Sequence, residues 1–438
     1  MKVLLVGSGA REHAVAWKLA GERAVSEIIC APGNAGIAKI ARCLPIDPGD
    51  PDALLALAER EAVDLTVVGP ELPLARGARD LFAAHDQPLF GPTRAAAQLE
   101  SSKAFAKQFM ARHRVPTARS HICESAGEAL ETLARGEFGF PVVLKADGLA
   151  AGKGVTIAQD RVSAEQAVRD AMVDRRFGDA GARLVIEEHL EGEEVSFFAI
   201  CDGRTAVTLP SAQDHKRAFD QDRGPNTGGM GAFAPSPLLT AGLHSRVMRE
   251  IVEPVLVGLR EEGHEYRGLL YVGLMLTADG PRVVEFNVRL GDPEAQVVLP
   301  MLAGDLLPLI ASAASGDLDS RTCDVGAEPH VGVVLAAGGY PGTYEKGKTI
   351  DGLDEAEAVP GTLVFHAGTR RRNGHVVTDG GRVLTVVGRG DSFAQAIERA
   401  YQAAACIKFD GKHARTDIGK KALPRTEAGP TTRRSARA

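Results

Sequence analysis

The most chemically specific segment of the chain is EFNVRLGDPE, residues 285–294. It follows a short apolar run that predicts a β-strand. Side chains two residues apart share one face of a strand, so Glu285, Asn287 and Arg289 should point the same way, with the residues between them in the core. A carboxylate, an amide oxygen and a guanidinium on one face suit Mg²⁺ together with a phosphate group. We therefore predict a metal and phosphate site here rather than a solvated strand face.

A second candidate is the glycine-rich segment KADGLAAGKGV, residues 145–155. It is not a Walker A loop, because Asp147 stands where the first glycine is required and Gly154 where Ser or Thr is required. A glycine and alanine loop between two strands can still fold over a triphosphate and offer backbone N–H groups. Lys145 ends the strand leading into this loop, and an ammonium buried there needs an anionic partner. The lysines at both sides favour a phosphate-binding loop over a surface hairpin.

The acidic segment 187–194 joins a strand of buried type to a following strand. Such a connection can receive adenine through its backbone groups and ribose hydroxyls through a carboxylate. Taken alone, however, its charges are more typical of a solvated face.

The N-terminal sequence Gly7-Ser8-Gly9 begins like a dinucleotide fingerprint. The third glycine is missing, since Glu12 stands there, and the second strand ends in Ala31-Pro32 without an acid for a ribose hydroxyl. A nicotinamide site is therefore disfavoured. The glycines can still open a helix N-terminus towards an anion such as a sugar phosphate, although a tight turn without a ligand explains this stretch equally well.

Residues 213–217, QDHKR, bring opposite charges together, and residues 225–231, PNTGGMG, form a turn that can approach a small ligand closely. His215 could act as an acid or base, but a hydrogen-bonded structural role is the stronger expectation. The sequence contains neither HExxH nor G-x-S-x-G, so zinc peptidase and common serine hydrolase chemistry have no support.

Alternating strands and helices must position these residues. In the first hundred residues we expect strands at 2–6, 28–31 and 64–69, and helices at about 11–20 and 50–61. Asp50 reads as the N-cap of the second helix and Pro51 as its first residue. This alternation predicts a parallel sheet with helices on its faces.

The remaining chain continues as helical from about 93 to 114, with strands at 142–145, 184–187 and 195–201 and a strand run from 269 to 286. A polar linker is expected at 317–328, a strand-rich unit at 331–388 and a closing helix at 393–407. The polar, basic end of the chain predicts a disordered tail at 424–438.

The composition bounds the function. With 438 residues, the chain is long enough for about three domains. The net charge of −6 argues against electrostatic binding of nucleic acid or anionic lipid by the protein as a whole. No apolar run approaches the ~20 residues of a membrane span. The start of the chain lacks a secretory pattern, and the six cysteines form no CxxC motif. We expect a cytoplasmic protein without a zinc site or a disulfide framework.

In their order along the chain, these segments resemble the phosphoribosylamine–glycine ligases, an ATP-grasp family. The likeness rests on residues 145–155, 214–217, 225–231 and 285–294, is supported by residues 7–13, 32–36, 69–71 and 336–342, and runs from residue 1 to about 423. Members of that family commonly have Cys where this chain has Val288, and Phe where it has Leu290.

The resemblance implies a multidomain protein of the α/β and α+β classes. It would have an N-terminal parallel α/β domain at 1–102, an ATP-grasp central domain at 103–325 with a lid at about 117–190, and a small strand-rich C-terminal domain at 326–423. The implied reaction joins glycine to 5-phosphoribosylamine in de novo purine biosynthesis, using ATP and Mg²⁺ or Mn²⁺. Glycyl phosphate is the intermediate, and glycinamide ribonucleotide, ADP and phosphate are the products. A monomer with small-molecule substrates, without nucleic acid or a membrane, is expected.

The resemblance also implies site residues. ATP phosphates would be held by Lys103 and Lys145 with the lid-loop residues Gly148, Gly152, Lys153 and Gly154, and adenosine by Glu187, Glu188, Leu190 and Glu194. Glu285 and Asn287 would bind the metal. Asp214, Lys216, Arg289 and Asp292 would contact the reacting substrates and serve catalysis, with Glu294 beside them and with Gly9 and Asn34 near the ribosylamine phosphate.

Three alternatives stay open at this point. The first is another ATP-grasp ligase with a different acid and amine, against which residues 214–217 and 225–231 speak. The second is a nicotinamide oxidoreductase based on Gly7–Gly9, which a cofactor titration would test. The third is a non-catalytic nucleotide-binding protein, against which the intact Glu285, Asn287 and Lys145 argue.

Overall fold

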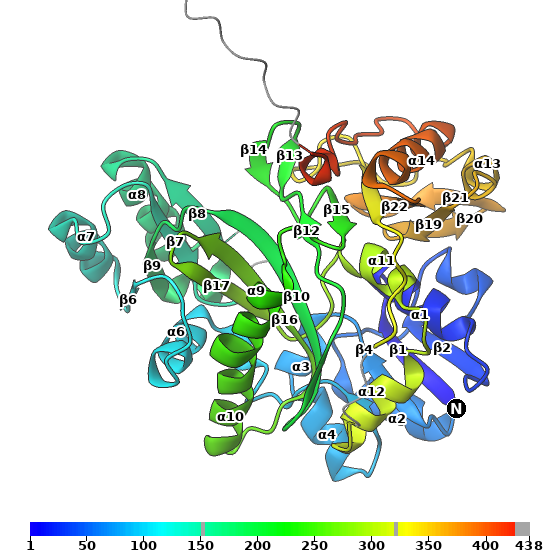
Figure 1. The fold of residues 1–438 in the computed structure, drawn as a ribbon, viewed down its shortest axis with the longest axis horizontal. Coiled ribbons are helices and arrows are strands. Elements are labelled where there is room, and N and C mark those ends of the chain that lie inside the picture. The colour runs from blue at the N-terminus through cyan, green and yellow to red at the C-terminus, as the bar shows by residue number, and fades with distance from the viewer. Residues whose placement is uncertain (150–153, 319–322, 425–438) are drawn as a thin grey trace, which may run out of the picture.

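The N-terminal part of the protein contains a five-stranded parallel sheet in the order β3-β2-β1-β4-β5 (Figure 1). The structure, a computed structural model, describes residues 1–149, 154–318 and 323–424. The strands are β1 (Lys2–Gly7), β2 (Glu27–Pro32), β3 (Arg42–Cys43), β4 (Leu65–Val68) and β5 (Leu89–Phe90). The helices are α1 (Ala10–Ala20), α2 (Pro51–Arg60), α3 (Glu71–Ala75) and α4 (Ala78–Ala84). The predicted parallel α/β arrangement is confirmed. The middle of β1 is apolar throughout, because helices and neighbouring elements cover both faces of the sheet.

Helix α2 begins as the sequence predicts. The Asp50 side chain accepts a hydrogen bond of 3.1 Å from the backbone N–H of Ala53, and Pro51 is the first helical residue.

The predicted helix from about 93 to 114 is wrong in its first part. The chain instead forms α5 (Gln98–Ser101) and α6 (Lys103–Arg112). Ser102 lies between them in an extended conformation, and its hydroxyl accepts a hydrogen bond of 3.0 Å from the Phe105 N–H. Ser102 therefore starts a new helix rather than continuing the first.

The segment predicted as the lid has its own antiparallel sheet, β6-β9-β7-β8, and projects to the left in Figure 1. Its strands are β6 (Ser120–Cys123), β7 (Val142–Ala146), β8 (Val155–Ala158) and β9 (Leu184–Glu188). The helices packed on it are α7 (Ala126–Arg135) and α8 (Arg161–Val168). A small apolar core inside this unit includes Cys123, Leu144 and Ile186.

The central antiparallel sheet has the order β11-β10-β16-β17 and carries the segment 285–287 on its last strand. The strands are β10 (Glu193–Asp202), β11 (Ala206–Thr208), β16 (Arg267–Thr277) and β17 (Gly280–Asn287). The helices of this region are α9 (Ala241–Val247), α10 (Glu253–Glu261), α11 (Ala295–Val298) and α12 (Leu307–Ser315). The register of β16 against β17 shifts between Gly273 and Leu274, which leaves Val284 unpaired in the ladder.

The last sheet, β12-β15-β18-β22-β19, joins two parts of the chain that lie on opposite sides of the expected boundary at residue 326. β12 (Gln213–Asp214) and β15 (Gly231–Ala234) come from the middle of the sequence, and β18 (His330–Ala336), β19 (Thr362–His366) and β22 (Arg382–Arg389) come from its end. The helices α13 (Leu353–Glu357) and α14 (Phe393–Cys406) and the hairpins β13–β14 (Arg217–Phe219, Arg223–Asn226) and β20–β21 (Thr369–Arg372, His375–Thr378) complete the region. Asp214 and Gly231, from two of the segments that were expected to contact substrate, therefore lie in the same sheet as strands of the C-terminal domain.

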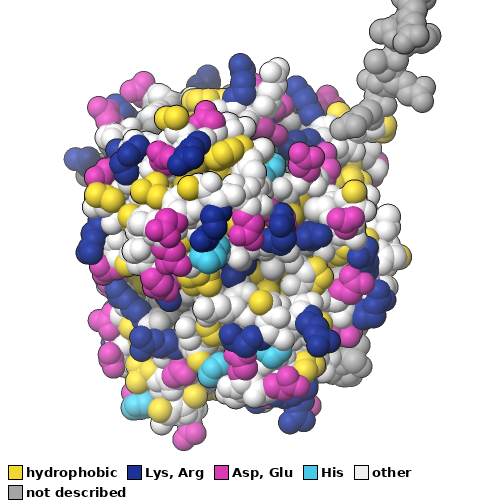
Figure 2. All heavy atoms as spheres, turned by 90° about the vertical axis from the view of Figure 1, so that its left-hand side faces the viewer, with side chains coloured by type: hydrophobic (Ala, Val, Ile, Leu, Met, Phe, Trp, Pro, Cys, Tyr) yellow, Lys and Arg dark blue, Asp and Glu magenta, His cyan; other side chains and the backbone are white. Residues whose placement is uncertain are grey.

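Within the described residues, no helix is both long and apolar enough to cross a membrane. On the face shown in Figure 2, acidic and basic side chains are interspersed. The predicted tail beyond residue 424 lies outside the described residues.

A buried histidine pair joins the N-terminal and C-terminal domains. The backbone N–H of His366 donates to Nδ1 of His13 over 2.8 Å, and the Asn34 amide donates to the His366 carbonyl over 2.7 Å. The two rings lie 5.6 Å apart. Burial lowers the pKa of each histidine to about 3, with Lys39 acting in the same direction, so both rings are neutral in the folded protein.

This pair predicts acid sensitivity. Each histidine takes up a proton more readily in the unfolded chain, so the free energy of unfolding should be constant above about pH 6.5 and fall as the pH decreases towards 3. Between pH 6.5 and 5 the loss should be about 2 kcal/mol per histidine. Urea unfolding at several pH values measures it. The His13→Asn/His366→Asn double variant should show a shallower pH dependence, whereas exposed His375→Asn should not. An unchanged slope in the double variant would contradict the assignment.

Candidate active site

The strand β17 presents its side chains as the sequence predicts. Phe286 and Val288 are each 2% exposed and pack into the core, whereas Glu285 and Asn287 are only partly buried. The guanidinium of Arg289 lies beside them and donates to the Asn287 amide oxygen over 3.2 Å. The three polar residues of the motif are thus together on one side of the chain.

Glu285 lies in a strongly positive environment. Burial raises the pKa of this carboxyl, but nearby cationic side chains outweigh that effect and hold the pKa below its ordinary value. These cations are Lys216, Lys145, Lys103 and Arg289. Among the described residues, none donates a hydrogen bond to the Glu285 carboxylate. It is therefore an ionised oxygen ligand that is open to a cation.

Lys145 has the anionic partner that its burial requires, and this partner belongs to the protein. The Lys145 ammonium lies 3.0 Å from Oε2 of Glu187 and donates to the Val284 carbonyl over 3.0 Å. Because the strand irregularity leaves Val284 out of the ladder, its carbonyl is available for this contact. Lys145 is held at the end of β7 and faces the same site as Glu285.

Lys103 lies at the start of α6 and reaches the glycine-rich loop. Its ammonium donates to the Gly148 carbonyl over 2.7 Å, and burial lowers its pKa although Glu285 acts in the opposite direction. Gly148 has φ +155°, and a Cβ there would come within 2.6 Å of the Ala180 Cβ, so the loop needs glycine at this position. The Gly154 carbonyl accepts from Ala146 over 2.8 Å, while Gly152 and Lys153 lie outside the described residues.

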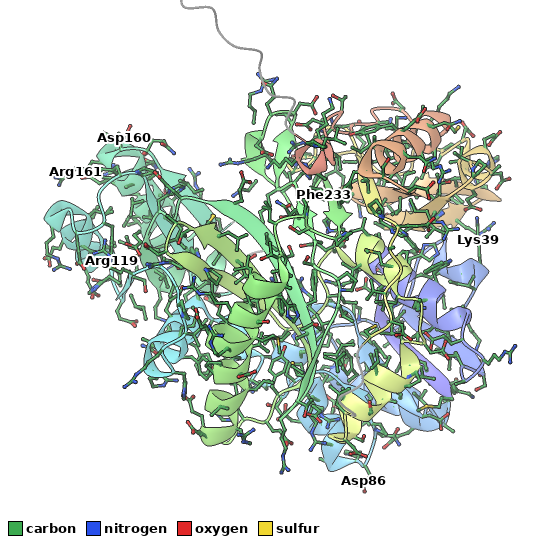
Figure 3. All side chains as sticks on the ribbon, in the orientation of Figure 1. Lys39, Asp86, Arg119, Asp160, Arg161 and Phe233 are labelled. Carbon is green, nitrogen blue, oxygen red and sulfur yellow. The ribbon has the colours of Figure 1, made fainter. Side chains whose placement is uncertain are left out.

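The structure divides the acidic segment 187–194 into different roles. The Glu187 carboxylate is 3% exposed and its Oε2 contacts both Lys145 and Lys107, at 3.0 and 3.3 Å. Its Oε1 has no hydrogen-bond partner among the described residues. Glu188 instead accepts from the Arg119 side chain over 2.7 Å at the lid surface, where Figure 3 labels Arg119.

The connection from β9 to β10 leaves backbone groups without a strand partner beside the Glu187 carboxylate. The strand pairing of β9 ends at Glu188, so no described strand pairs with His189 or Leu190. Backbone groups at the end of a strand can hydrogen bond to the edge of a base, as the sequence suggested for this segment.

Glu194, Lys216 and Asp214 form the next group. The Lys216 ammonium is hydrogen bonded to Oε2 of Glu194. Burial lowers the pKa of Lys216, but Glu194, Asp214 and Glu285 together raise it well above its ordinary value. Glu194 is therefore paired with a substrate-site lysine, which was not foreseen for a ribose-binding residue.

Asp214 is a carboxyl with an unusually high pKa. Burial raises its pKa to about 7, with Glu294, Glu194 and Glu285 acting in the same direction and Lys216 opposing them. A carboxyl with this pKa changes its charge near neutral pH and can exchange a proton with a substrate amine.

Asp214 predicts the pH dependence of turnover. The carboxylate is the form that attracts the amine, so kcat/KM for the amine substrate should rise as the pH passes through about 7. The Asp214→Asn variant should lose this rise, whereas the exposed Asp354→Asn variant should keep it. A pH profile between 5.5 and 8.5 makes the comparison, and an unchanged profile in Asp214→Asn would exclude Asp214 as the titrating group.

Arg289 is held by two carboxylates that the sequence reasoning missed. Its Nη2 lies 2.8 Å from Glu100 and its Nε donates to Glu71 over 3.3 Å. A further N–H donates to the Leu290 carbonyl over 3.1 Å. With the Asn287 contact, four of the five guanidinium donors serve the protein itself, which leaves one for a ligand.

The side chain of Glu100 also binds the backbone of the metal motif. It accepts from the Val288 N–H over 2.7 Å, although it lies on α5, far away in sequence. Its sequence signal was weak, because a lone Glu in a helical stretch is ordinarily a surface residue.

Asp292 and Glu294 face different neighbours. Asp292 is paired with Arg382 over 3.0 Å and accepts from Gln296 over 2.7 Å. Burial raises the pKa of the Asp292 carboxyl, but the charges of Arg382 and Arg11 outweigh that effect and hold the pKa below its ordinary value. Glu294 accepts from the buried Ser196 hydroxyl over 3.1 Å.

The N-terminal glycine packet surrounds a protein carboxylate. The Gly9 N–H donates to Glu12, and a Cβ at Gly7, Gly9 or Gly69 would lie within 2.7 Å of the Glu12 side chain. These glycines are therefore required by the packing of Glu12 at the start of α1. A Cβ at Gly9 would also lie 3.4 Å from the Asp292 carboxylate, so this loop borders the site.

Asn34 serves the scaffold rather than an open ligand position. Its amide donates to the carbonyls of Ser8 and His366, over 2.9 and 2.7 Å, and its oxygen accepts from the N–H groups of Gly36 and Ile37. Asn34 thus shapes the turn beside Gly9 and ties it to the C-terminal domain.

The structure contradicts the expected hydrogen-bonded role of His215. Neither ring nitrogen has a partner among the described residues, although the residue is only 1% exposed. Its ring packs 5.9 Å from Phe233, which Figure 3 labels. Burial lowers its pKa to about 4, so His215 is a neutral core residue facing away from Asp214 and Lys216.

Among the described residues, no group of three or more His, Cys, Asp or Glu side chains has the geometry of a metal site. Glu285 and Asn287 alone offer two oxygen ligands. This fits Mg²⁺, which commonly takes one or two protein ligands and completes its shell with substrate phosphate and water.

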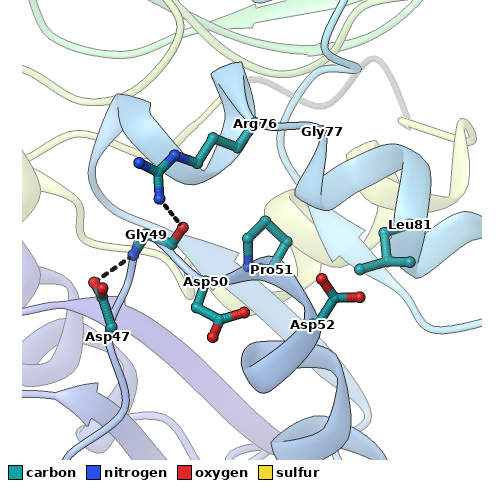
Figure 4. A pocket seen from close by; sticks show the side chains of 8 residues that line it. All are labelled: Asp47, Gly49, Asp50, Pro51, Asp52, Arg76, Gly77 and Leu81. Atoms are coloured by element: carbon teal, nitrogen blue, oxygen red, sulfur yellow. Dashed lines mark hydrogen bonds between the residues drawn. The ribbon is translucent and has the colours of Figure 1, made fainter.

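A surface cavity of about 660 Å³ lies in the N-terminal domain, among none of the predicted site residues (Figure 4). Its polar groups are engaged locally: Asp50 caps α2, and Asp47 and Arg76 bind the backbone of Gly49. It does not contribute to the site around Glu285.

Comparison with known proteins gives a match over nearly the whole chain. Three family models described as "Phosphoribosylglycinamide synthetase" match the chain: the N domain at residues 1–100, the ATP-grasp (A) domain at 101–295 and the C domain at 330–421. The phosphoribosylamine–glycine ligase of Xylella fastidiosa is 51% identical over 430 residues, which cover 97% of this chain and 99% of the relative. That of Pseudomonas aeruginosa is 50% identical over 428 residues, with 97% and 99% covered.

Solved structures agree with this match. A phosphoribosylamine–glycine ligase from Thermotoga maritima gives a TM-score of 0.84 at 35% identity, covering 95% of this chain and 100% of that one. A biotin carboxylase complex from Campylobacter jejuni gives a TM-score of 0.72 at 16% identity, over 94% and 92% of the chains. The latter likeness concerns the fold alone.

Proposed function

The chain belongs to the phosphoribosylamine–glycine ligase family, the enzymes that join glycine to 5-phosphoribosylamine with ATP in purine biosynthesis, and we propose that this ligation takes place around Glu285. The observation that carries the proposal is the ionised Glu285 carboxylate, which lies among lysines and is open to a cation. A phosphate-bearing nucleotide with its metal supplies the charges that this arrangement lacks.

The reaction has two steps. An oxygen of the glycine carboxylate attacks the γ-phosphorus of ATP, so that ADP leaves and glycyl phosphate forms. The amine of 5-phosphoribosylamine then attacks the glycyl carbonyl, the C–O bond to phosphate breaks, and an amide forms as the amine loses a proton. No protein nucleophile is needed, so the enzyme acts by positioning and charge neutralisation.

We assign the nucleotide side to the lid and to α6. Lys103 and Lys145 converge from different elements near Glu285 and neutralise phosphate oxygens, with Gly148 hydrogen bonded to Lys103 beside them. The open backbone of His189 and Leu190 receives adenine, beside the unpartnered Oε1 of Glu187. Gly152 and Lys153 remain expectations from the sequence for the same loop.

Glu285 and Asn287 would hold Mg²⁺ or Mn²⁺. When bound, the metal supplies positive charge that neutralises the phosphates during transfer. Arg289 orients the Asn287 oxygen through its contact of 3.2 Å and keeps one donor for a substrate anion.

We assign the acid and amine substrates to the opposite side of Glu285. Asp214, whose pKa of about 7 lies near neutral pH, accepts the proton that the attacking amine loses. Lys216 offers an ammonium for an anionic group of the substrates, with Asp292 and Glu294 bordering the site. The lid closes over glycyl phosphate and protects it from water.

The test is ADP release by the purified protein with ATP and Mg²⁺. Glycine and phosphoribosylamine generated in place are supplied together and then omitted in turn. Release that requires both, with formation of glycinamide ribonucleotide, supports the proposal. If ATP binds but this pair is not used, another acid and amine pair of the ATP-grasp ligases is indicated. We also propose that the protein is cytoplasmic, is a monomer and acts on small molecules only. Light scattering of the purified protein tests the monomeric state.

A further inference from the structure

The C-terminal domain reaches into the substrate side of the site through Arg382, the first residue of β22. Its Nη1 donates to the Asp292 carbonyl over 2.6 Å and also to the Gly228 carbonyl, and its Nη2 lies 3.0 Å from the Asp292 carboxylate. One guanidinium thus holds two loops that are far apart in the sequence. Arginine suits this task because its planar fork offers several donors in a rigid geometry.

Tyr340, a second residue of the C-terminal domain, binds the same turn, which comprises residues 227–229. The Tyr340 hydroxyl accepts from the Gly228 N–H over 2.9 Å. A Cβ at Gly228 would lie 3.1 Å from the Arg382 Cζ and 3.3 Å from the Tyr340 oxygen. Gly228 is therefore held on both backbone groups by the C-terminal domain, and its lack of a side chain allows this close approach.

The turn passes this restraint on to Lys216. The Thr227 N–H and hydroxyl donate to the Lys216 carbonyl over 2.8 and 2.9 Å, and the Gly229 N–H donates to the Thr227 hydroxyl over 3.0 Å. The position of the Lys216 backbone is thus set by a turn that Arg382 and Tyr340 hold.

Asp292 extends the same restraint to the N-terminal domain. Its carboxylate lies 3.4 Å from a Cβ built at Gly9, and the charge of Arg11 lowers its pKa together with that of Arg382. Three domains therefore meet at Asp292, on the side of the site that faces the start of α1.

We propose that Arg382 and Tyr340 are positioning residues for the phosphoribosylamine subsite, acting through the Gly228 turn and Asp292. Among the described residues, neither side chain hydrogen bonds to a residue assigned to ATP. The C-terminal domain is on this basis required to shape the ribosylamine subsite, and the nucleotide subsite is independent of it. This inference rests on the proposed function.

The test compares three variants by their affinity for glycinamide ribonucleotide, a stable probe of the ribosylamine subsite, and by steady-state kinetics. Arg382→Ala should weaken glycinamide ribonucleotide binding and raise KM for phosphoribosylamine by ~10- to 100-fold, as expected when a charged hydrogen-bonding group is removed. Tyr340→Phe, which removes one oxygen atom, should do so by ~3- to 10-fold. The dissociation constant for ATP should change less than about 2-fold in both, since the nucleotide residues are untouched.

Arg389→Ala is the matched control. Arg389 ends the same strand, and its side chain pairs with the exposed Glu328 over 3.5 Å. It should bind glycinamide ribonucleotide like the wild type.

The outcomes separate this inference from the function on which it rests. If the wild type binds glycinamide ribonucleotide but both variants bind it equally well, or if ATP affinity falls in parallel, the positioning role is wrong. If the wild type neither binds the probe nor turns over, the proposed function itself has failed. Should Arg382→Ala not fold, Tyr340→Phe decides, because loss of one hydroxyl leaves the packing of its ring in place.

Discussion

Replacing Glu285 with glutamine should reduce kcat by at least about 10²- to 10³-fold while leaving the fold intact. Glutamine has nearly the same size as glutamate but cannot supply the negative charge that holds a divalent cation among the phosphates. Because no described residue hydrogen bonds to this carboxylate, its replacement breaks no contact within the described protein. ADP release under saturating substrates gives kcat, and thermal unfolding reports on the fold.

The control for this experiment is Glu261→Gln, at the exposed end of α10. It makes the same change of charge away from the site and should retain wild-type turnover. Near-normal activity in Glu285→Gln would remove the metal assignment. Nearby lysines hold the pKa of Glu285 below its ordinary value, so its charge stabilises the folded protein. Glu285→Gln should therefore remain folded but unfold at a somewhat lower temperature than the wild type.

Replacing Glu187 with alanine should lower the free energy of unfolding by about 3–5 kcal/mol. The carboxylate is the shared partner of Lys107 and Lys145, and all three side chains are buried. Burial already lowers the pKa of Lys107 to about 8 although Glu187 acts in the opposite direction. Without Glu187, two ammonium groups would remain in a poorly solvated region. Urea unfolding at pH 7 measures the loss.

The adjacent residue provides the control for this prediction. Glu188 pairs with Arg119, which is 62% exposed in its side chain, so Glu188→Ala should cost less than about 1 kcal/mol. An equal loss in the two variants would show that the Glu187 pairing contributes no more than a surface contact. The ATP affinity of Glu187→Ala should fall as well, because Lys145 loses the group that holds it towards the site.

The sequence by itself was sufficient for the elements that depend on local pattern. The apolar run before Glu285 and the alternation after it placed Phe286 and Val288 in the core, as the structure confirms. The start of α2 was predicted from Asp50 and Pro51, because capping and a preset φ act within one turn of chain. The family followed from several such segments in one order.

The tertiary structure decided which charges meet. Glu100 and Glu71 hold Arg289, and Glu187 holds Lys145, although nothing in the local sequence marks these pairs. Likewise Arg382 reaches the Gly228 turn only because β12 and β15 join the C-terminal sheet. Residues this far apart meet through long-range strand pairing and burial, so local periodicity carries no information about them. The sequence thus determined the chemistry available to this ligase, and the packing of three domains determined which groups remain free to use it.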